Sequence, residues 1–201
     1  KSSKKIAYNA VGEIVQDTQG NKISYDVFGL TTQVIKASES GHSADTVRYQ
    51  YNAEGSQYHE VINGNTTGEY TFYYLGNELL GENSENHQNI SYLYTGQIIG
   101  SIGGHGNLQL LITDQSHNTL ETFKNGSLSH EYLYSAYGVS YDIDNQNNTN
   151  TFNPIGFDGE RTDPETHWQF LGGGYRAYDP TLGRMLQTDS LAYSPFGKGG
   201  I

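Results

Sequence analysis

The chain has 201 residues, and its formal charge of −11 at neutral pH argues against a nucleic-acid partner, because phosphate binding needs a basic face. Only 34% of the residues are hydrophobic, yet 17 tyrosines and 25 glycines are present. Disordered chains are poor in aromatic residues, so this composition favours β-structure with tyrosine-covered faces. The absence of cysteine excludes disulfides and thiolate zinc sites.

The start of the chain leads directly into a strand pattern, without an initiator methionine or a signal peptide. We therefore expect the chain to be a fragment or a processed piece of a longer protein. No apolar run approaches the roughly 18 residues that a membrane span needs. The sequence therefore predicts no membrane span.

A five-residue repeat, Tyr-[Asn/Asp]-x-x-Gly, occurs three times in the first part of the chain. Its tyrosines are Tyr8, Tyr25 and Tyr51, and its glycines are Gly12, Gly29 and Gly55. In each copy a strand ends in an aromatic residue, the Asx side chain hydrogen-bonds the turn backbone, and glycine accepts a positive φ. A weaker copy spans 134–138, and a longer one spans 178–183.

Between the repeats, residues alternate as they do in strands, for example over 46–51, 69–74 and 90–94. Asn63-Gly64 and Asn125-Gly126 each separate two such segments and predict tight hairpins, because this pair tolerates a type I′ turn. No window carries a convincing helical period. The predicted fold is all-β, built of successive antiparallel β-hairpins.

Two polar segments, 81–89 and 142–151, interrupt the strand pattern and are predicted to be surface loops. Residues 142–147 resemble a calcium loop, but they lack its glycine and its final glutamate. No pair of histidines has the spacing of a helical zinc site. The sequence therefore indicates neither a metal nor a cofactor.

A dense motif follows residue 155 and ends in Tyr178-Asp179-Pro180-Thr181-Leu182-Gly183-Arg184. It resembles the RHS repeat-associated core, whose pattern begins G-x-x-x-D-x-E-T-G and continues R-x-Y-[DN]-P-x-x-G-R-[FM]-x-x-x-D. The match covers about 35 residues, and the upstream repeats resemble the YD repeats of the same family. His167 departs from the pattern, since the family usually has glycine at this turn.

The RHS resemblance implies a spiralling β-shell that encloses a C-terminal toxin, as in the C component of Tc toxins and in bacterial polymorphic toxins. It divides the chain into a YD-repeat shell segment, 1–152, and a core segment, 153–201, which curls inward to plug one end. We expect the core segment to be truncated before the family's cleavage junction.

The family's core also carries an aspartate-dependent self-cleavage, which needs two carboxylates that share a proton. By its match to the last aspartate of the pattern, Asp189 is a candidate for one of them, with Arg184 as its charge partner. The second aspartate is missing, so the chain is not expected to be an enzyme by itself. In the structural alternative, Asp189 caps a turn and Arg184 forms an ion pair with a carboxylate such as Asp179.

The leading hypothesis is a shell segment that encapsulates a toxin and helps to deliver it. Its expected partners are the rest of the shell, the toxin cargo and a delivery subunit, and open strand edges permit self-association. The resemblance implies a secreted protein, or one delivered to target cells. Two alternatives remain open: an adhesin-like module that binds glycans or a receptor, and half of an autoprotease that is complete only in the full-length protein.

Overall fold

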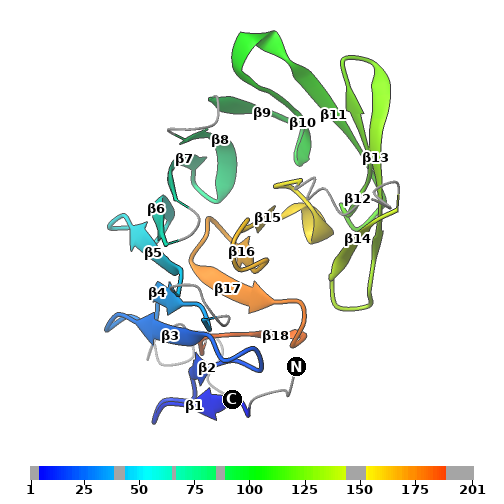
Figure 1. The fold of residues 1–201 in the computed structure, drawn as a ribbon. Coiled ribbons are helices and arrows are strands. Elements are labelled where there is room, and N and C mark those ends of the chain that lie inside the picture. Colours follow the sequence, from blue (N-terminus) through cyan, green and yellow to red (C-terminus); the bar gives the residue numbers. More distant parts are fainter. Residues whose placement is uncertain (1–4, 39–43, 65–66, 85–88, 144–152, 189–201) are drawn as a thin grey trace, which may run out of the picture.

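The computed structural model describes residues 5–38, 44–64, 67–84, 89–143 and 153–188, and most of its regular structure is antiparallel β-sheet (Figure 1). The prediction of an all-β fold in successive hairpins is confirmed. Two short 3-10 segments interrupt the strands, η1 (Gly104–Gly106) and η2 (Phe157–Gly159). The described residues contain no helix long and apolar enough to cross a membrane.

The larger sheet has fourteen strands, each paired with its neighbour in sequence. They are β1 (Ala7–Tyr8), β2 (Ile14–Gln16), β3 (Lys22–Tyr25), β4 (Thr31–Ile35), β5 (Thr46–Tyr51), β6 (Gln57–Asn63), β7 (Gly68–Leu75), β8 (Glu78–Ser84), β9 (Ile90–Tyr94), β10 (Ile98–Ile102), β11 (Leu108–Thr113), β12 (Thr119–Lys124), β13 (Ser127–Tyr134) and β14 (Ser140–Asp142). Figure 1 shows that this sheet follows an arc and does not close into a barrel.

The smaller sheet lies inside this arc (Figure 1). Its four strands are β15 (Arg161–Thr162), β16 (Gln169–Leu171), β17 (Arg176–Asp179) and β18 (Arg184–Met185). The division of the chain at residue 153 stays a prediction. Residues on both sides of it contribute to each of the two hydrophobic clusters among the described residues.

The turns between strands have the geometry that the repeat predicts. Asn52 Oδ1 accepts hydrogen bonds from the backbone N–H groups of Glu54 and Ser56, both at 2.9 Å. Gly55 lies between them at φ +88°, a conformation that a side chain would strain. The copies at Asn9 and Asp26 are built in the same way.

The tyrosine of the repeat joins neighbouring hairpins. The hydroxyl of Tyr51 donates to the carbonyl of Thr31 at 2.8 Å, and that of Tyr25 donates to the carbonyl of Ile14 at 2.7 Å. In both cases the acceptor belongs to an earlier strand. In these two copies tyrosine suits the position better than phenylalanine, because the ring is partly buried while the hydroxyl satisfies a backbone acceptor.

The hydrophobic core begins with a row of paired aliphatic residues on the inner face of the large sheet. Ile23 pairs with Val34, Val34 with Val47, and Val47 with Ile62, so that four consecutive strands each contribute one side chain. All four are buried and contact residues of the smaller sheet and its flanks. Those residues are Trp168, Phe170, Ala177 and Leu186.

Two sequence predictions can be compared with the strands directly. Asn125-Gly126 joins β12 to β13 with positive φ angles of 51° and 85°, as a type I′ turn requires. The prediction of a surface loop over 81–89 is wrong at its start, because residues 81–84 form the end of β8. Residues 85–88, and most of the calcium-like segment 142–147, lie outside the described residues.

Candidate functional site

Charged side chains meet in the buried space between the two sheets. The exposed fraction is 0% for Glu60 and Asp163 and 4% for Arg161, although charged residues are seldom buried unless they are paired. Glu82 and the Tyr49 hydroxyl complete the group, which we call the acid–arginine cluster. It contains residues of β5, β6 and β8 from the large sheet, and residues in and next to β15 from the small one.

Arg161 lies at the centre of the acid–arginine cluster. Its Nη2 is 3.3 Å from Oε2 of Glu60, and its Nε is 3.5 Å from Oε2 of Glu82. The guanidinium also lies over the ring of Phe72, 3.9 Å from the ring centroid. Burial alone would lower the pKa of Arg161, but the carboxyl groups of Glu60, Glu82 and Asp163 together raise it above its usual value.

The carboxyl groups of Glu60 and Asp163 are joined by a hydrogen bond. Burial first, and then the charge of Asp163, raise the pKa of Glu60 well above its usual value of 4.5. Both effects favour the protonated form of the Glu60 carboxyl group.

The Asp163 carboxylate is well supplied with donors. The Tyr49 hydroxyl donates to Oδ2 at 3.0 Å, and the backbone N–H groups of Glu165 and Thr166 donate to Oδ1 at 2.8 and 2.7 Å. The two backbone bonds close the turn before β16. His167, in the same turn, has a φ of +58°, which explains why the RHS pattern has glycine there.

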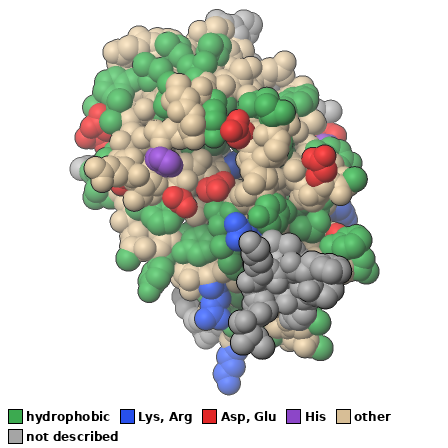
Figure 2. All heavy atoms as spheres, turned by 180° about the vertical axis from the view of Figure 1, so that it is seen from behind, with side chains coloured by type: hydrophobic (Ala, Val, Ile, Leu, Met, Phe, Trp, Pro, Cys, Tyr) green, Lys and Arg blue, Asp and Glu red, His purple; other side chains and the backbone are tan. Residues whose placement is uncertain are grey.

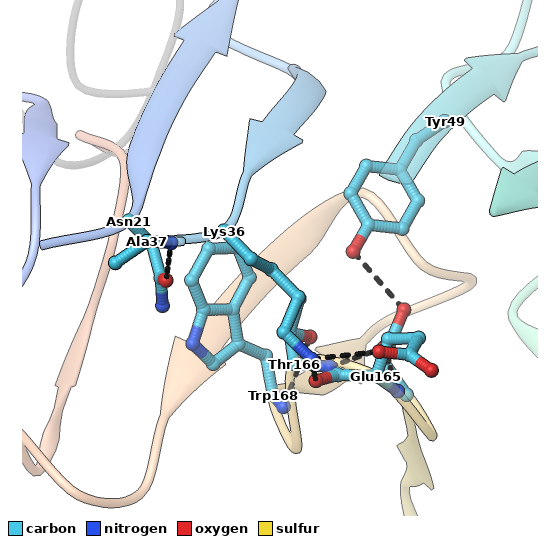
Figure 3. Close-up of polar contacts among 8 residues, drawn as sticks. Asn21, Lys36, Ala37, Tyr49, Glu165, Thr166 and Trp168 are labelled. Carbon is cyan, nitrogen blue, oxygen red and sulfur yellow. Dashed lines mark hydrogen bonds and ion pairs between the residues drawn. The ribbon is translucent and has the colours of Figure 1, made fainter. Parts of the chain in front are cut away.

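A second ion pair holds the same turn from outside the cluster. Lys36, directly after β4, places Nζ 2.7 Å from Oε2 of Glu165 and also donates to the Glu165 carbonyl at 3.1 Å. Figure 3 shows Lys36 and Tyr49 reaching this turn from separate strands of the large sheet. The large sheet thus contacts the turn at two independent points.

The acid–arginine cluster brings two carboxyl groups together in a buried space, an arrangement that resembles an acid–base pair. However, the side chain of Glu60 is 0% exposed, so a substrate could not reach it without opening the sheets. The arrangement suits a structural lock between the arc and residues 153–188, which we call the inner segment. Among the described residues, no group of three or more His, Asp or Glu side chains could hold a metal ion.

The candidate cleavage residues are only partly described. Asp189 lies outside the described residues. Arg184 is exposed on β18, and its Nη1 donates to the Tyr8 hydroxyl at 2.6 Å. Its backbone pairs with Asp179, but the Asp179 carboxylate accepts hydrogen bonds from the N–H groups of its own turn instead. Arg184 thus joins the start of the chain to the core motif.

The other residues of the terminal motif build its turn. The hydroxyl of Tyr178 donates to the carbonyl of Tyr137 at 2.9 Å, so the motif also contacts the weaker repeat at 134–138. Pro180 is buried in the turn, and Gly183 has a φ of +63° next to the Tyr137 ring.

The residues of the acid–arginine cluster were not predicted from the sequence. Glu60 stands two residues before the buried Ile62, so strand alternation places both side chains on the same face of β6. Asp163 was also visible as the first fixed aspartate of the RHS pattern. Glu82 had no such signal, because it stands in a polar segment of the kind that usually forms a loop.

No protein-family model and no curated protein sequence matches the chain. Solved structures do match it. One is TcdB2-TccC3, with a TM-score of 0.66 and 18% identity, covering 90% of this chain and 10% of that chain. TcdB2-TccC3-Cdc42 and TcdB2-TccC3-TEV match with TM-scores of 0.65 and 0.68, at 18% and 17% identity, each covering 90% of this chain and 9% of theirs.

The chain thus spans about a tenth of the length of the chains that it matches. At this level of identity the likeness concerns the fold. It agrees with the fold that the YD-type repeats and the terminal motif predict from the sequence. The chain therefore has an RHS-type fold like that of a Tc toxin component.

Proposed function

We propose that the chain forms part of the wall of a β-shell that encloses a cargo polypeptide and helps to deliver it. One observation carries the proposal: the fourteen-stranded sheet curves around a later segment of the chain and shares a hydrophobic core with it. The likeness of the fold to TcdB2-TccC3 supports the same role.

The inner face of the arc is suited to holding polypeptide. Three backbone hydrogen bonds join it to the inner segment, well apart along the sheet. They run from Ile14 N to Leu186 O at 2.9 Å, from Gln57 N to Gly173 O at 3.0 Å, and from Thr119 N to Gly156 O at 3.1 Å. In the proposed function, these bonds and the acid–arginine cluster fix the inner segment as a plug, and the rest of the shell continues the chamber.

The proposed role needs no catalysis by this chain. The contact of Arg184 with Tyr8 supports a structural role for that arginine. In the proposed assembly, the remainder of the shell covers the free edges of β1 and β14, which would otherwise pair with other chains. A delivery subunit then carries the closed shell out of the producing cell to its target.

Protease protection in the full-length protein tests the proposal. The polypeptide that follows the shell should resist a protease while the shell itself is intact. Arg161→Met, which removes the central charge of the lock, should make it cleavable under native conditions. Val27→Ser serves as the control, because Val27 is 93% exposed and contributes nothing to the core. If the following polypeptide is cut as fast in the native wild type as in the denatured protein, enclosure is wrong.

A further inference from the structure

A cavity of about 350 Å³ lies where the inner segment meets the tips of three hairpins of the arc. Its walls are the turns β7–β8, β9–β10 and β11–β12 on one side, and residues 155–161 with Phe170 on the other. Figure 2 shows acidic side chains and a histidine near the middle of one face, around a hollow in the surface. Its volume is at the lower end for small-molecule sites.

The walls of the cavity combine aromatic rings, carboxyl groups and side-chain amides. They include the rings of Tyr74 and Tyr94, the carboxyl groups of Glu78, Asp158 and Glu160, and the amides of Asn77 and Gln97. Such a lining offers both donors and acceptors next to apolar faces. A small number of fixed polar groups among apolar ones is the usual composition of a site for a small ligand.

Several of these groups are held in place without a ligand. The backbone N–H of Asp158 donates to Oδ1 of Asn118 at 2.9 Å, which fixes the loop that carries the carboxyl group. Tyr94 is hydrogen-bonded to Glu78 across the rim. The Glu160 carboxyl accepts a backbone hydrogen bond from Gly172. The cavity is thus preorganised, which lowers the entropy cost of binding.

Arg161 provides the observation that points to a ligand. It lines the cavity and is only 4% exposed, yet its Nη1 donates to no acceptor among the described residues. A buried N–H group without an acceptor costs free energy, and a ligand oxygen would remove that cost. The ligand must therefore bring acceptors as well as donors for the carboxyl groups.

The mixture of charges decides the class of ligand. A small anion is disfavoured by the carboxyl groups of Glu78, Asp158 and Glu160, and a simple cation carries no acceptor for the unpartnered Nη1 of Arg161. A neutral polyhydroxyl ring suits every wall, because its hydroxyls donate to carboxylates and accept from N–H groups, while its C–H faces stack on tyrosine. We propose that this cavity binds a neutral saccharide of one or two rings.

The proposal is independent of the shell function, so either can fail alone. Its test is a glycan array of neutral mono- and disaccharides probed with the intact protein, followed by calorimetric titration of the best binder. Asp158→Asn and Gln97→Ala change opposite walls and should each weaken binding about tenfold or more. Thermal melting confirms that each variant is folded.

Two tyrosines of similar exposure give a matched control. Tyr94→Ala at the rim should weaken binding, whereas Tyr58→Ala on the outside of β6 should leave it unchanged; the two residues are 38% and 42% exposed. The proposal is overturned if no array saccharide binds at millimolar concentration, or if Asp158→Asn and Gln97→Ala both bind like the wild type. Preference for a cationic peptide over every saccharide would also overturn it.

Discussion

Arg161 Nη2 lies 3.3 Å from Oε2 of Glu60, although 101 residues separate the two in the sequence. This buried contact joins the arc to the segment inside it. The raised pKa of Glu60 favours its protonated form, whereas Glu82 and Asp163 bring further carboxyl groups to Arg161. The two members of the contact should therefore respond very differently to substitution.

Arg161→Met should lower the free energy of unfolding by about 3–5 kcal/mol, because it leaves buried carboxylates without a counter-charge. Glu60→Gln should cost about 1 kcal/mol or less, since an amide can donate to Asp163 and accept from Arg161 as the neutral acid does. Urea unfolding measures both. Lys36→Met, which removes a partly exposed ion pair, is the control and should cost about 1 kcal/mol or less. Equal losses for Arg161→Met and Glu60→Gln would mean that Glu60 is ionised.

The acidity of Glu160 predicts a pH dependence of stability. Burial raises the pKa of Glu160 to about 7, from 4.5 in an unfolded chain. Between these pH values the folded state therefore binds more protons than the unfolded state. The contribution of Glu160 to the free energy of unfolding falls as the pH rises from about 4.5 to 7. Discounted for partial exposure, the loss is about 1–3 kcal/mol.

Glu160→Gln isolates this contribution. The difference in unfolding free energy between the wild type and the variant should change between pH 4.5 and 7.5 and then level off. Glu54→Gln, in an exposed turn, should show no such change. If the unfolding free energies of the wild type and of Glu160→Gln change in parallel across this range, the pKa of Glu160 is not raised.

Tyr51→Phe tests the bond that joins one hairpin to the previous one. It leaves the carbonyl of Thr31 without the hydroxyl donor at 2.8 Å and should cost about 1 kcal/mol. Tyr58→Phe is the matched control, because the Tyr58 hydroxyl bonds only an exposed glutamine side chain. Chemical denaturation compares the two, and equal costs would show that the bond between hairpins contributes nothing.

The local structure could be predicted from the sequence, but the contacts between distant segments could not. Strands 46–51 and 90–94 have the predicted bounds, because alternation and turn residues act within a few positions. Glu82 was predicted to lie in a loop, because polar segments are usually exposed to solvent. In the structure its carboxyl group faces Arg161. No local pattern marks a pair whose members come together only when the sheet has curved.

His167 is a local departure that the fold explains. Its φ of +58° places a non-glycine residue in the left-handed region, at a cost of about 1 kcal/mol. His167→Gly should therefore raise the midpoint of thermal unfolding. Arg48→Gly, at an exposed position of β5, should lower it, because glycine loses more conformational entropy when the strand folds. If both substitutions lower the midpoint equally, the turn is not strained.

Substitutions at two glycines with the same φ angle distinguish the cost of backbone strain from the cost of close packing. Gly55 and Gly174 both have a φ of +88°, but a Cβ at Gly55 would meet nothing within 4 Å, whereas one at Gly174 would lie 2.7 Å from Cβ of Gln57. Gly55→Ala should therefore cost about 1 kcal/mol, from backbone strain alone. Gly174→Ala should cost about 1–3 kcal/mol more, because the clash pushes the inner segment away from β6. Urea unfolding measures the difference, and equal costs would mean that the inner segment is not packed tightly against the arc at this point.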